Sequence, residues 1–328
     1  EKIFLTCKKF RTFEQKLAEM RISIVLPCYN EEKNIPLIYE ALRQFLDSYK
    51  SPLTYEIIFV NDGSKDNTLQ EIKKLSAQKE EIKYISFSRN FGHQMALKAG
   101  IDVSSGDAVI TMDSDLQHPV HLMADLIRKW QEGYDIVVTK RVDKKQNVGL
   151  LKKWTSVLFY KIMRWLSDLE IEEGSADFKL YDKKVVEVIK QTQDVHLFLR
   201  GLVPWMGFHQ YTIEYEPQER LYGESKYSFF RMLNFAINGI TGFSIKPLRL
   251  AIFAGFLFFM LSVLYIIYAL MVKFVLHQAI SGWTSLIMSV WLIGGIQLII
   301  LGIIGEYIGK MYIQTKNRPL YIIKEKKV

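Results

Sequence analysis

Cysteine is scarce in this chain. The 328 residues include only two, Cys7 and Cys28. Cys28 ends an apolar run that is typical of a core strand, so we do not expect it to form a structural disulfide. This usage is typical of a protein in a reducing compartment.

Two common nucleotide-binding motifs are also absent. Neither G-x-G-x-x-G nor G-x-x-x-x-G-K-[ST] occurs, so neither dinucleotide binding nor P-loop chemistry is predicted. A nucleotide diphosphate bound by this chain would need another clamp. A divalent metal held by acidic side chains is the natural one.

Charge is nearly missing from two long runs near the C-terminus. Residues 250–272 carry none, and residues 283–305 are interrupted only by Gln297. Each run is long enough to cross a bilayer. Lysine and arginine gather outside both runs, whereas the link between them carries only Lys273 and His277. The positive-inside rule therefore predicts a cytoplasmic head and cytoplasmic ends.

The formal net charge is +8. Because apolar spans are present, this balance favours an anionic membrane surface or phosphate-bearing substrates over nucleic acid.

The first two thirds of the chain alternate apolar strands with amphipathic helices. This pattern predicts an α/β fold with a mainly parallel sheet covered on both faces. The expected strands are 22–26, 55–60, 84–87, 108–112 and 135–139. The expected helices are 35–49, 68–78, 94–103, 118–131 and 183–191.

Polar side chains follow the expected strands at their carboxyl ends, where such sheets bind ligands. We therefore expect one shared site from these residues: Asn30, Glu31, Asp62, Arg89, Asn90, Asp113, Asp115 and Arg141. Asp113 and Asp115 suit Mg²⁺ or Mn²⁺, although an ordinary acidic turn has the same pattern. Asp62 suits a base or ribose, although a helix cap or Asx turn is an equal alternative.

Four motifs in order resemble one family. They are VLPCYNEE at 25–32, NDGSKDNT at 61–68, SRNFGHQ at 88–94 and DSDLQHP at 113–119. They look like GT-A-type family 2 glycosyltransferases, with a Rossmann-like sheet, and most like the polyprenyl-phosphate hexosyltransferase branch. That branch includes dolichol-phosphate mannose synthase and two-span bactoprenol glucosyltransferases. The resemblance runs from about residue 21 to the C-terminus.

The resemblance implies roles for individual residues. Nucleotide contacts are implied for Pro27, Tyr29, Glu31 and Asp62. Metal and diphosphate contacts are implied for Asp113, Asp115 and Gln117, with Asp115 also in the catalytic set.

The later segments add candidates that each have a structural alternative. Arg141 closes a strand and suits an acceptor phosphate. Asp177, with Ser175 nearby, is implied to face the sugar and the acceptor, as a base or as an orienting group, but it could be a helix cap. Arg220 and Lys226 lie in a glycine-containing loop that suits a diphosphate, catalytically in the case of Arg220. A basic patch meeting lipid headgroups is the alternative for this loop.

The resulting hypothesis is an inverting transferase. It would move a hexose from a nucleotide diphosphate sugar, expected to be UDP-glucose, to polyprenyl (undecaprenyl) phosphate at the cytoplasmic membrane face, with Mg²⁺ or Mn²⁺. Mannose, galactose, an N-acetylhexosamine or formylated aminoarabinose are alternatives. A processive polysaccharide synthase is disfavoured because Q-x-x-R-W is missing. A non-catalytic scaffold is disfavoured by the intact acidic residues.

The expected organisation has five parts. They are an N-terminal arm (1–20), a GT-A domain (21–225), a juxtamembrane interfacial helix (226–246), a two-helix membrane region (247–309) and a basic cytoplasmic tail (310–328). The expected partners are the nucleotide-sugar donor, the lipid phosphate acceptor and the bilayer, with a homo-oligomer and no nucleic acid.

Overall fold

The structure is a computed structural model that describes residues 20–49, 53–142, 174–195, 197–216, 241–242, 244–274 and 282–328. The described residues fall into two compact units. The first holds residues up to 142, 174–216 and the C-terminal 319–328, and the second holds residues 241–318.

The first unit is built on a mixed eight-stranded sheet in the order β7-β5-β6-β4-β1-β2-β3-β8. The four strands β4, β1, β2 and β3 are parallel, β6 and β8 run antiparallel to their inner neighbours, and β7 is parallel to β5. The strands are β1 (Arg21–Cys28), β2 (Thr54–Asn61), β3 (Ile82–Phe87), β4 (Ala108–Thr111), β5 (Ile136–Arg141), β6 (Ser175–Asp182), β7 (Gln210–Tyr215) and β8 (Ile323–Lys327).

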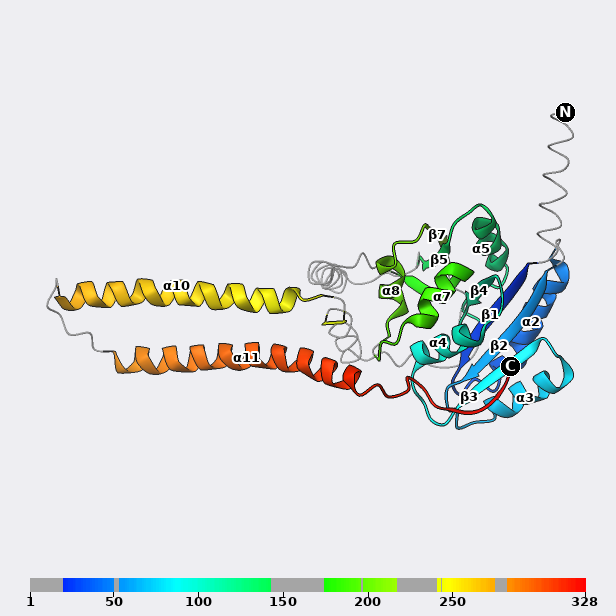
Figure 1. The fold of residues 1–328 in the computed structure, drawn as a ribbon, viewed down its shortest axis with the longest axis horizontal. Helices are drawn as coiled ribbons and strands as arrows, with labels where there is room; N and C mark the ends of the chain where they lie inside the picture. The colour runs from blue at the N-terminus through cyan, green and yellow to red at the C-terminus, as the bar shows by residue number, and fades with distance from the viewer. Residues whose placement is uncertain are drawn as a thin grey trace, which may run out of the picture. The chain divides into compact units, whose positions relative to one another are not determined.

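Helices pack on both faces of this sheet (Figure 1). They are α2 (Asn34–Ser48), α3 (Thr68–Gln78), α4 (His93–Val103), α5 (Leu122–Gln131), α7 (Lys183–Gln191) and α8 (Leu199–Trp205). Apolar residues of α2, α3 and α5 join one core cluster, and those of α4, α7 and α8 join the other. Two separate cores explain why the central strands are apolar on both sides.

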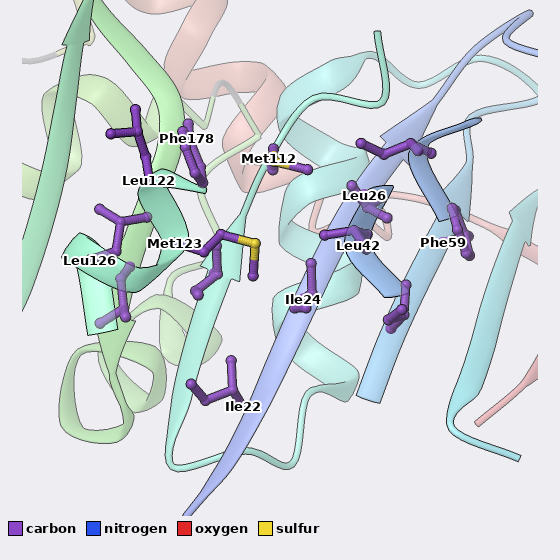
Figure 2. Packing of buried hydrophobic residues seen from close by; sticks show 14 of the residues in the cluster. Ile22, Ile24, Leu26, Leu42, Phe59, Met112, Leu122, Met123, Leu126 and Phe178 are labelled. Carbon is purple, nitrogen blue, oxygen red and sulfur yellow. The ribbon is translucent and has the colours of Figure 1, made fainter. Parts of the chain in front are cut away.

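The side-chain alternation of β1 shows how the first core forms. Ile22, Ile24 and Leu26 point to the face that α2 and α5 cover, where Leu42 and Met123 pack beside them (Figure 2). All five side chains are fully buried. Each such burial contributes about 1.5–3 kcal/mol relative to an exposed position.

A buried acidic residue lies at the opposite end of the sheet from the predicted site. Glu56, near the start of β2, is fully buried and receives hydrogen bonds from Ser23 Oγ (2.5 Å), Ser105 N (2.8 Å) and Arg21 Nη2 (3.0 Å). Burial alone would raise its pKa, but the hydrogen bonds from Ser23, Lys83 and Ser105 outweigh burial and lower the pKa to about 2. Glu56 is therefore a structural anion.

Most expected elements of the head are confirmed. The strands β1 to β5 and the helices α2 to α5 and α7 lie within a few residues of their predicted bounds. Strands β6, β7 and β8 and helix α8 were not predicted. In β6, Asp177 and Lys179 occupy buried positions, and these charges hide the apolar pattern of a strand.

The C-terminal segment returns to the sheet. Strand β8 pairs with β3 antiparallel, and Ser88 N donates to Ile322 O at 3.0 Å. Tyr321 stacks on Phe87 with ring centroids 5.0 Å apart, and its hydroxyl donates to Asp102 Oδ2 at 2.8 Å. The sequence hypothesis of a basic tail over 310–328 did not foresee this strand.

The second unit contains α10 (Lys246–Phe274) and α11 (Trp283–Thr315), which lie side by side and antiparallel (Figure 1). Both are long and apolar enough to cross a membrane. Their most apolar stretches, Lys246–Tyr265 and Ser289–Thr315, have mean hydropathies of 2.1 and 1.8 and are not buried. An apolar surface of this length is unsuited to water, so the helices indicate membrane association.

Candidate functional site

The predicted residues meet at one edge of the sheet. Strands β1, β2, β4 and β5 end there, and β6 begins there because it runs in the opposite direction. This antiparallel strand pairs Ser175 with Lys140 of β5 and brings Asp177 beside β4, where Thr111 Oγ1 donates to Asp177 O at 2.6 Å.

Asp113 follows β4 and faces two histidines. Its Oδ2 lies 3.0 Å from His118 Nε2, and His118 Nδ1 lies 2.8 Å from the hydroxyl of Tyr215. Its Oδ1 lies 3.3 Å from His93 Nε2. Within the part of the chain that the structure describes, Oδ1 is buried and has no hydrogen-bond partner. The interaction of Oδ1 with His93 is therefore an ion pair when His93 is protonated, without hydrogen-bond geometry.

The turn after Asp113 is unusual in its backbone. Leu116 has φ 62°, in the left-handed region that is uncommon for a leucine. Gln117 N donates to Asp115 Oδ1 at 3.1 Å, and Arg141 Nη1 donates to Gln117 Oε1 at 3.4 Å. The turn thus brings Arg141, at the end of β5, next to the acidic motif.

These residues fit a divalent metal that shares its coordination with a substrate. Asp113, Asp115 and Gln117 offer carboxylate and amide oxygens, the ligands that Mg²⁺ and Mn²⁺ prefer. Among the described residues, no group of three or more His, Cys, Asp or Glu side chains is arranged to hold a metal. Phosphate oxygens of a bound substrate would complete the coordination, as is usual for Mg²⁺.

Asp177 is only 5% exposed, and its carboxylate contacts several side chains of the site. Arg200 of α8 binds it bidentately, with Nε 3.0 Å from Oδ1 and Nη2 2.9 Å from Oδ2. His93 Nε2 lies 3.2 Å from Oδ2. Burial alone would raise the pKa of Asp177, but the hydrogen bond from His93 and the charge of Arg200 hold this pKa well below its usual range.

His93 lies between the carboxylates of Asp113 and Asp177. Burial alone would lower its pKa, but Asp113 and Asp177 outweigh burial and raise it to about 9. Without a bound metal, this pKa favours the protonated form of His93 at neutral pH, although His93 lies at the first turn of α4, where a helix dipole disfavours positive charge. The negative charges of Asp113 and Asp177 offset this unfavourable interaction with the helix dipole.

Asp62 organises the neighbouring loop. Its carboxylate is almost fully buried and accepts hydrogen bonds from Phe91 N (2.6 Å) and Gly92 N (3.0 Å). Burial raises its pKa, and the two amide hydrogen bonds oppose that rise. This loop leads directly into His93. Nucleotide contact by Asp62 stays a prediction, and its structural role is to hold the loop between β3 and α4.

The loops after β1 and β2 are joined to each other. Asn30, with φ 58°, receives a hydrogen bond from Lys65 N at 2.9 Å on Oδ1 and donates its own N–H to Ser64 Oγ at 3.0 Å. Gly63 also has a positive φ of 66°, and a Cβ there would lie 2.4 Å from the carbonyl carbon of Arg89. Only glycine fits this turn.

The remaining nucleotide candidates lie along the β1 loop. Pro27 O accepts a hydrogen bond from Ser114 Oγ at 3.0 Å, which joins this loop to the acidic motif. Tyr29 is 43% exposed, and Glu31 Oε2 accepts from Asn34 Nδ2 at 2.5 Å. Their contacts with a nucleotide stay predictions. Arg220 and Lys226 lie outside the described residues.

Sequence reasoning missed four residues of the site: His93, His118, Arg200 and Tyr215. The first two lie inside the quoted motifs at 88–94 and 113–119, so their position after a strand end was an available signal. Arg200 and Tyr215 belong to elements that were not predicted, and their pairing with Asp177 and His118 is visible only in the tertiary structure.

Two family models match this chain, one in the sheet domain and one in the helical hairpin of α10 and α11. The family model "Glycosyl transferase family 2" matches residues 23–190, and "GtrB C-terminal hairpin" matches residues 246–311. An uncharacterized glycosyltransferase, YkcC, of Bacillus subtilis is 43% identical over 93% of this chain and 94% of its own length. The SfII prophage-derived bactoprenol glucosyl transferase of Shigella flexneri is 42% identical over 93% of this chain and 98% of its own.

Among solved structures, a mannosyltransferase from Pyrobaculum calidifontis in complex with GDP-Man and Mn²⁺ is 16% identical, with a TM-score of 0.46 over 70% of this chain and 64% of its own. The family match covers more than half of the described head and the curated relatives span nearly the whole chain. The mixed, mostly parallel sheet is the GT-A fold that the motifs implied. The chain is a member of glycosyltransferase family 2.

Proposed function

We propose that this enzyme transfers glucose from UDP-glucose to a polyprenyl phosphate, with inversion at the anomeric carbon. The observation that carries the proposal is the acidic edge of the sheet, with Asp113 and Asp115, in a chain that also holds two helices suited to a membrane. Relatives over nearly the whole length are named bactoprenol glucosyl transferases, which supports glucose as the transferred sugar and a polyprenyl lipid as the acceptor.

The transfer requires little proton chemistry. A phosphate monoester has a second pKa of about 6, so the acceptor is largely dianionic at neutral pH and is already nucleophilic. One of its oxygens forms a bond to the anomeric carbon while the bond to the donor's diphosphate breaks. The nucleotide diphosphate leaves with the electron pair. Arg141, which is exposed beside Gln117, would grip the acceptor phosphate.

A divalent cation, Mg²⁺ or Mn²⁺, would be held by Asp113 and Asp115 with Gln117 beside them. When bound, it would neutralise the charge that develops on the departing diphosphate. The carboxylate and amide oxygens of these three residues, which follow one another in a single turn after β4, support this assignment. Arg220 and Lys226 are proposed to donate to the same diphosphate, and Ser175 to the acceptor.

We place the catalytic head and both ends of the chain in the cytoplasm, because basic residues flank the two membrane helices on the outside of the hairpin. A homo-oligomer is also proposed. Within the described residues, and apart from the neighbouring backbone of α11 itself, no atom lies within 4 Å of a Cβ built on Gly302, Gly305 or Gly309, so this small-residue face is open to another helix.

A donor panel tests the proposed function. Purified protein would be incubated with Mg²⁺, undecaprenyl phosphate and, in turn, labelled UDP-glucose, UDP-galactose, UDP-N-acetylglucosamine and GDP-mannose. We expect label in the lipid fraction with UDP-glucose, as a single hexose per lipid. Preferred use of another donor would correct the sugar, and a long polymer would favour the processive synthase. No transfer from any donor would refute the proposal.

A further inference from the structure

Two guanidinium nitrogens of Arg200, on helix α8, donate hydrogen bonds to the carboxylate of Asp177 and hold it in place. Arg200 contributes Nε and Nη2, at 3.0 and 2.9 Å from the two carboxylate oxygens. The planar guanidinium matches a carboxylate in this bidentate geometry, and a lysine would not. The Arg200 side chain is 32% exposed and the Asp177 side chain 6%, so the carboxylate is shielded from solvent while the guanidinium keeps a partly exposed surface.

Gln94 ties the same carboxylate to the start of α8. Its Nε2 donates to Asp177 Oδ2 at 3.4 Å, and its Oε1 accepts from Leu199 N at 3.0 Å. Leu199 is the first residue of α8 and precedes Arg200. The first N–H groups of a helix have no partner within the helix. Gln94 therefore accepts a hydrogen bond from one of these N–H groups. This contact positions the start of α8 and, with it, Arg200.

This arrangement leaves Asp177 poorly suited to accept a proton. Its Oδ2 faces Arg200, His93 and Gln94 together. Donors to the charged form of a carboxylate stabilise the anion and weaken it as a base. The dianionic acceptor, in the reaction proposed above, needs no base. The arrangement instead holds the negatively charged carboxylate of Asp177 in one position.

We infer that Arg200 is a positioning residue for the transfer, which holds Asp177 so that this carboxylate acts through its place and charge and not as a general base. The inference rests on the proposed function, because transfer is its readout. Through His93, Asp177 is also connected to Asp113. Loss of Arg200 would therefore disturb the reacting geometry more than the affinity for the donor.

The test compares Arg200→Ala and Arg200→Lys with the wild type in steady-state transfer from the donor that the panel identifies. A misplacement of about 1 Å in a site costs about 100-fold in rate. We expect kcat to fall about 100-fold in Arg200→Ala and about 10-fold in Arg200→Lys, with the donor KM within about threefold. Millimolar guanidinium should restore part of the Arg200→Ala activity.

Arg128→Ala is the matched control. Arg128 pairs with Asp125 on α5 and its side chain is 63% exposed, so we expect this variant to behave as the wild type. The double variant Asp177→Asn/Arg200→Ala should lose no more than the worse single variant, because the two residues act as one unit. Arg200→Lys keeps the buried charge compensated and is the variant to rely on if Arg200→Ala does not fold.

The remaining outcomes distinguish a failure of the proposed function from a failure of the role inferred for Arg200. A wild-type chain that transfers no sugar refutes the proposed function. A wild-type chain that transfers sugar while Arg200→Ala or Arg200→Lys matches its kcat within twofold refutes this inference alone. A loss confined to the donor KM, or additive losses in the double variant, would also overturn it.

Discussion

The hydroxyl of Tyr321 gives a sharp test of how the C-terminal segment supports the head. It donates to Asp102 Oδ2 at 2.8 Å, and Asp102 also pairs with the buried Lys98. A hydrogen bond to a charged group contributes about 1.5–3 kcal/mol. Because the Asp102 side chain is 23% exposed, the lower end applies, and Tyr321→Phe should cost about 1.5 kcal/mol.

Tyr321→Ala removes the ring as well as the hydroxyl. The ring stacks on Phe87 at a centroid distance of 5.0 Å, and truncation of a packed aromatic residue costs about 3–5 kcal/mol. The two variants therefore separate the hydrogen bond from the packing. A cost of about 1.4 kcal/mol is tenfold in an equilibrium constant, so Tyr321→Phe should raise the open population of the head about tenfold and Tyr321→Ala at least about 100-fold.

Cys28 provides the assay. It is 1% exposed in the central strand β1, and burial raises the pKa of its thiol, so it reacts only when the head opens. In a Cys7→Ser background Cys28 is the single thiol. Its labelling rate in mild urea would be compared among the wild type and both Tyr321 variants.

Tyr39→Phe is the control for this experiment, since its hydroxyl makes no hydrogen bond to any described residue although its ring packs against the core. We expect its labelling rate to equal that of the wild type. Unchanged labelling in both Tyr321 variants would refute the conclusion that residues 319–328 are an integral part of the sheet domain.

Three further predictions concern the site and the sheet. Asp115→Asn should abolish turnover at any Mg²⁺ concentration and leave the unfolding temperature unchanged, and near-native activity would remove the metal assignment. Arg141→Ala should raise the KM of the lipid acceptor, and an effect on the donor KM alone would contradict its role. Glu56 has a pKa lowered from 4.5 to about 2. Its contribution, about 3 kcal/mol, is therefore present above pH 4.5 and lost as the pH falls towards 2. Urea unfolding at a series of pH values should show a loss of stability on acidification that is about 3 kcal/mol larger in the wild type than in Glu56→Gln.

Several features of the fold followed from local patterns. Apolar runs of strand length, such as 22–26 and 108–112, are explained only by burial on both faces, which parallel strands between helices provide. Parallel strands end at one edge, so the order of strands and polar residues along the chain was enough to assign Asp62, Asp113 and Arg141 to a common site. The uncharged runs 250–272 and 283–305 likewise predicted two helices long enough to cross a bilayer, because an ordinary buried helix rarely sustains such a run.

Other features were not available from local patterns. Strand β6 carries Asp177 and Lys179 at buried positions, where the usual pattern of a strand has apolar residues. Strand β8 consists of the sequence IKEKK, which has no strand periodicity at all. Both strands form because a neighbouring edge is present to pair with them, and such pairing depends on contacts across long sequence separations.

The sequence by itself determined which residues are apolar enough to be buried, which strand ends carry oxygen-bearing side chains and which helices are long and apolar enough to cross a membrane. Only the tertiary structure decided which side chain lies beside each buried charged group and stabilises it. Asp177 is held by Arg200, His93 by Asp113 and Asp177, and Asp102 by Tyr321 and Lys98. The reason is that a buried charge is stable only beside a partner, and the partner's place in space is set by the packing of whole elements.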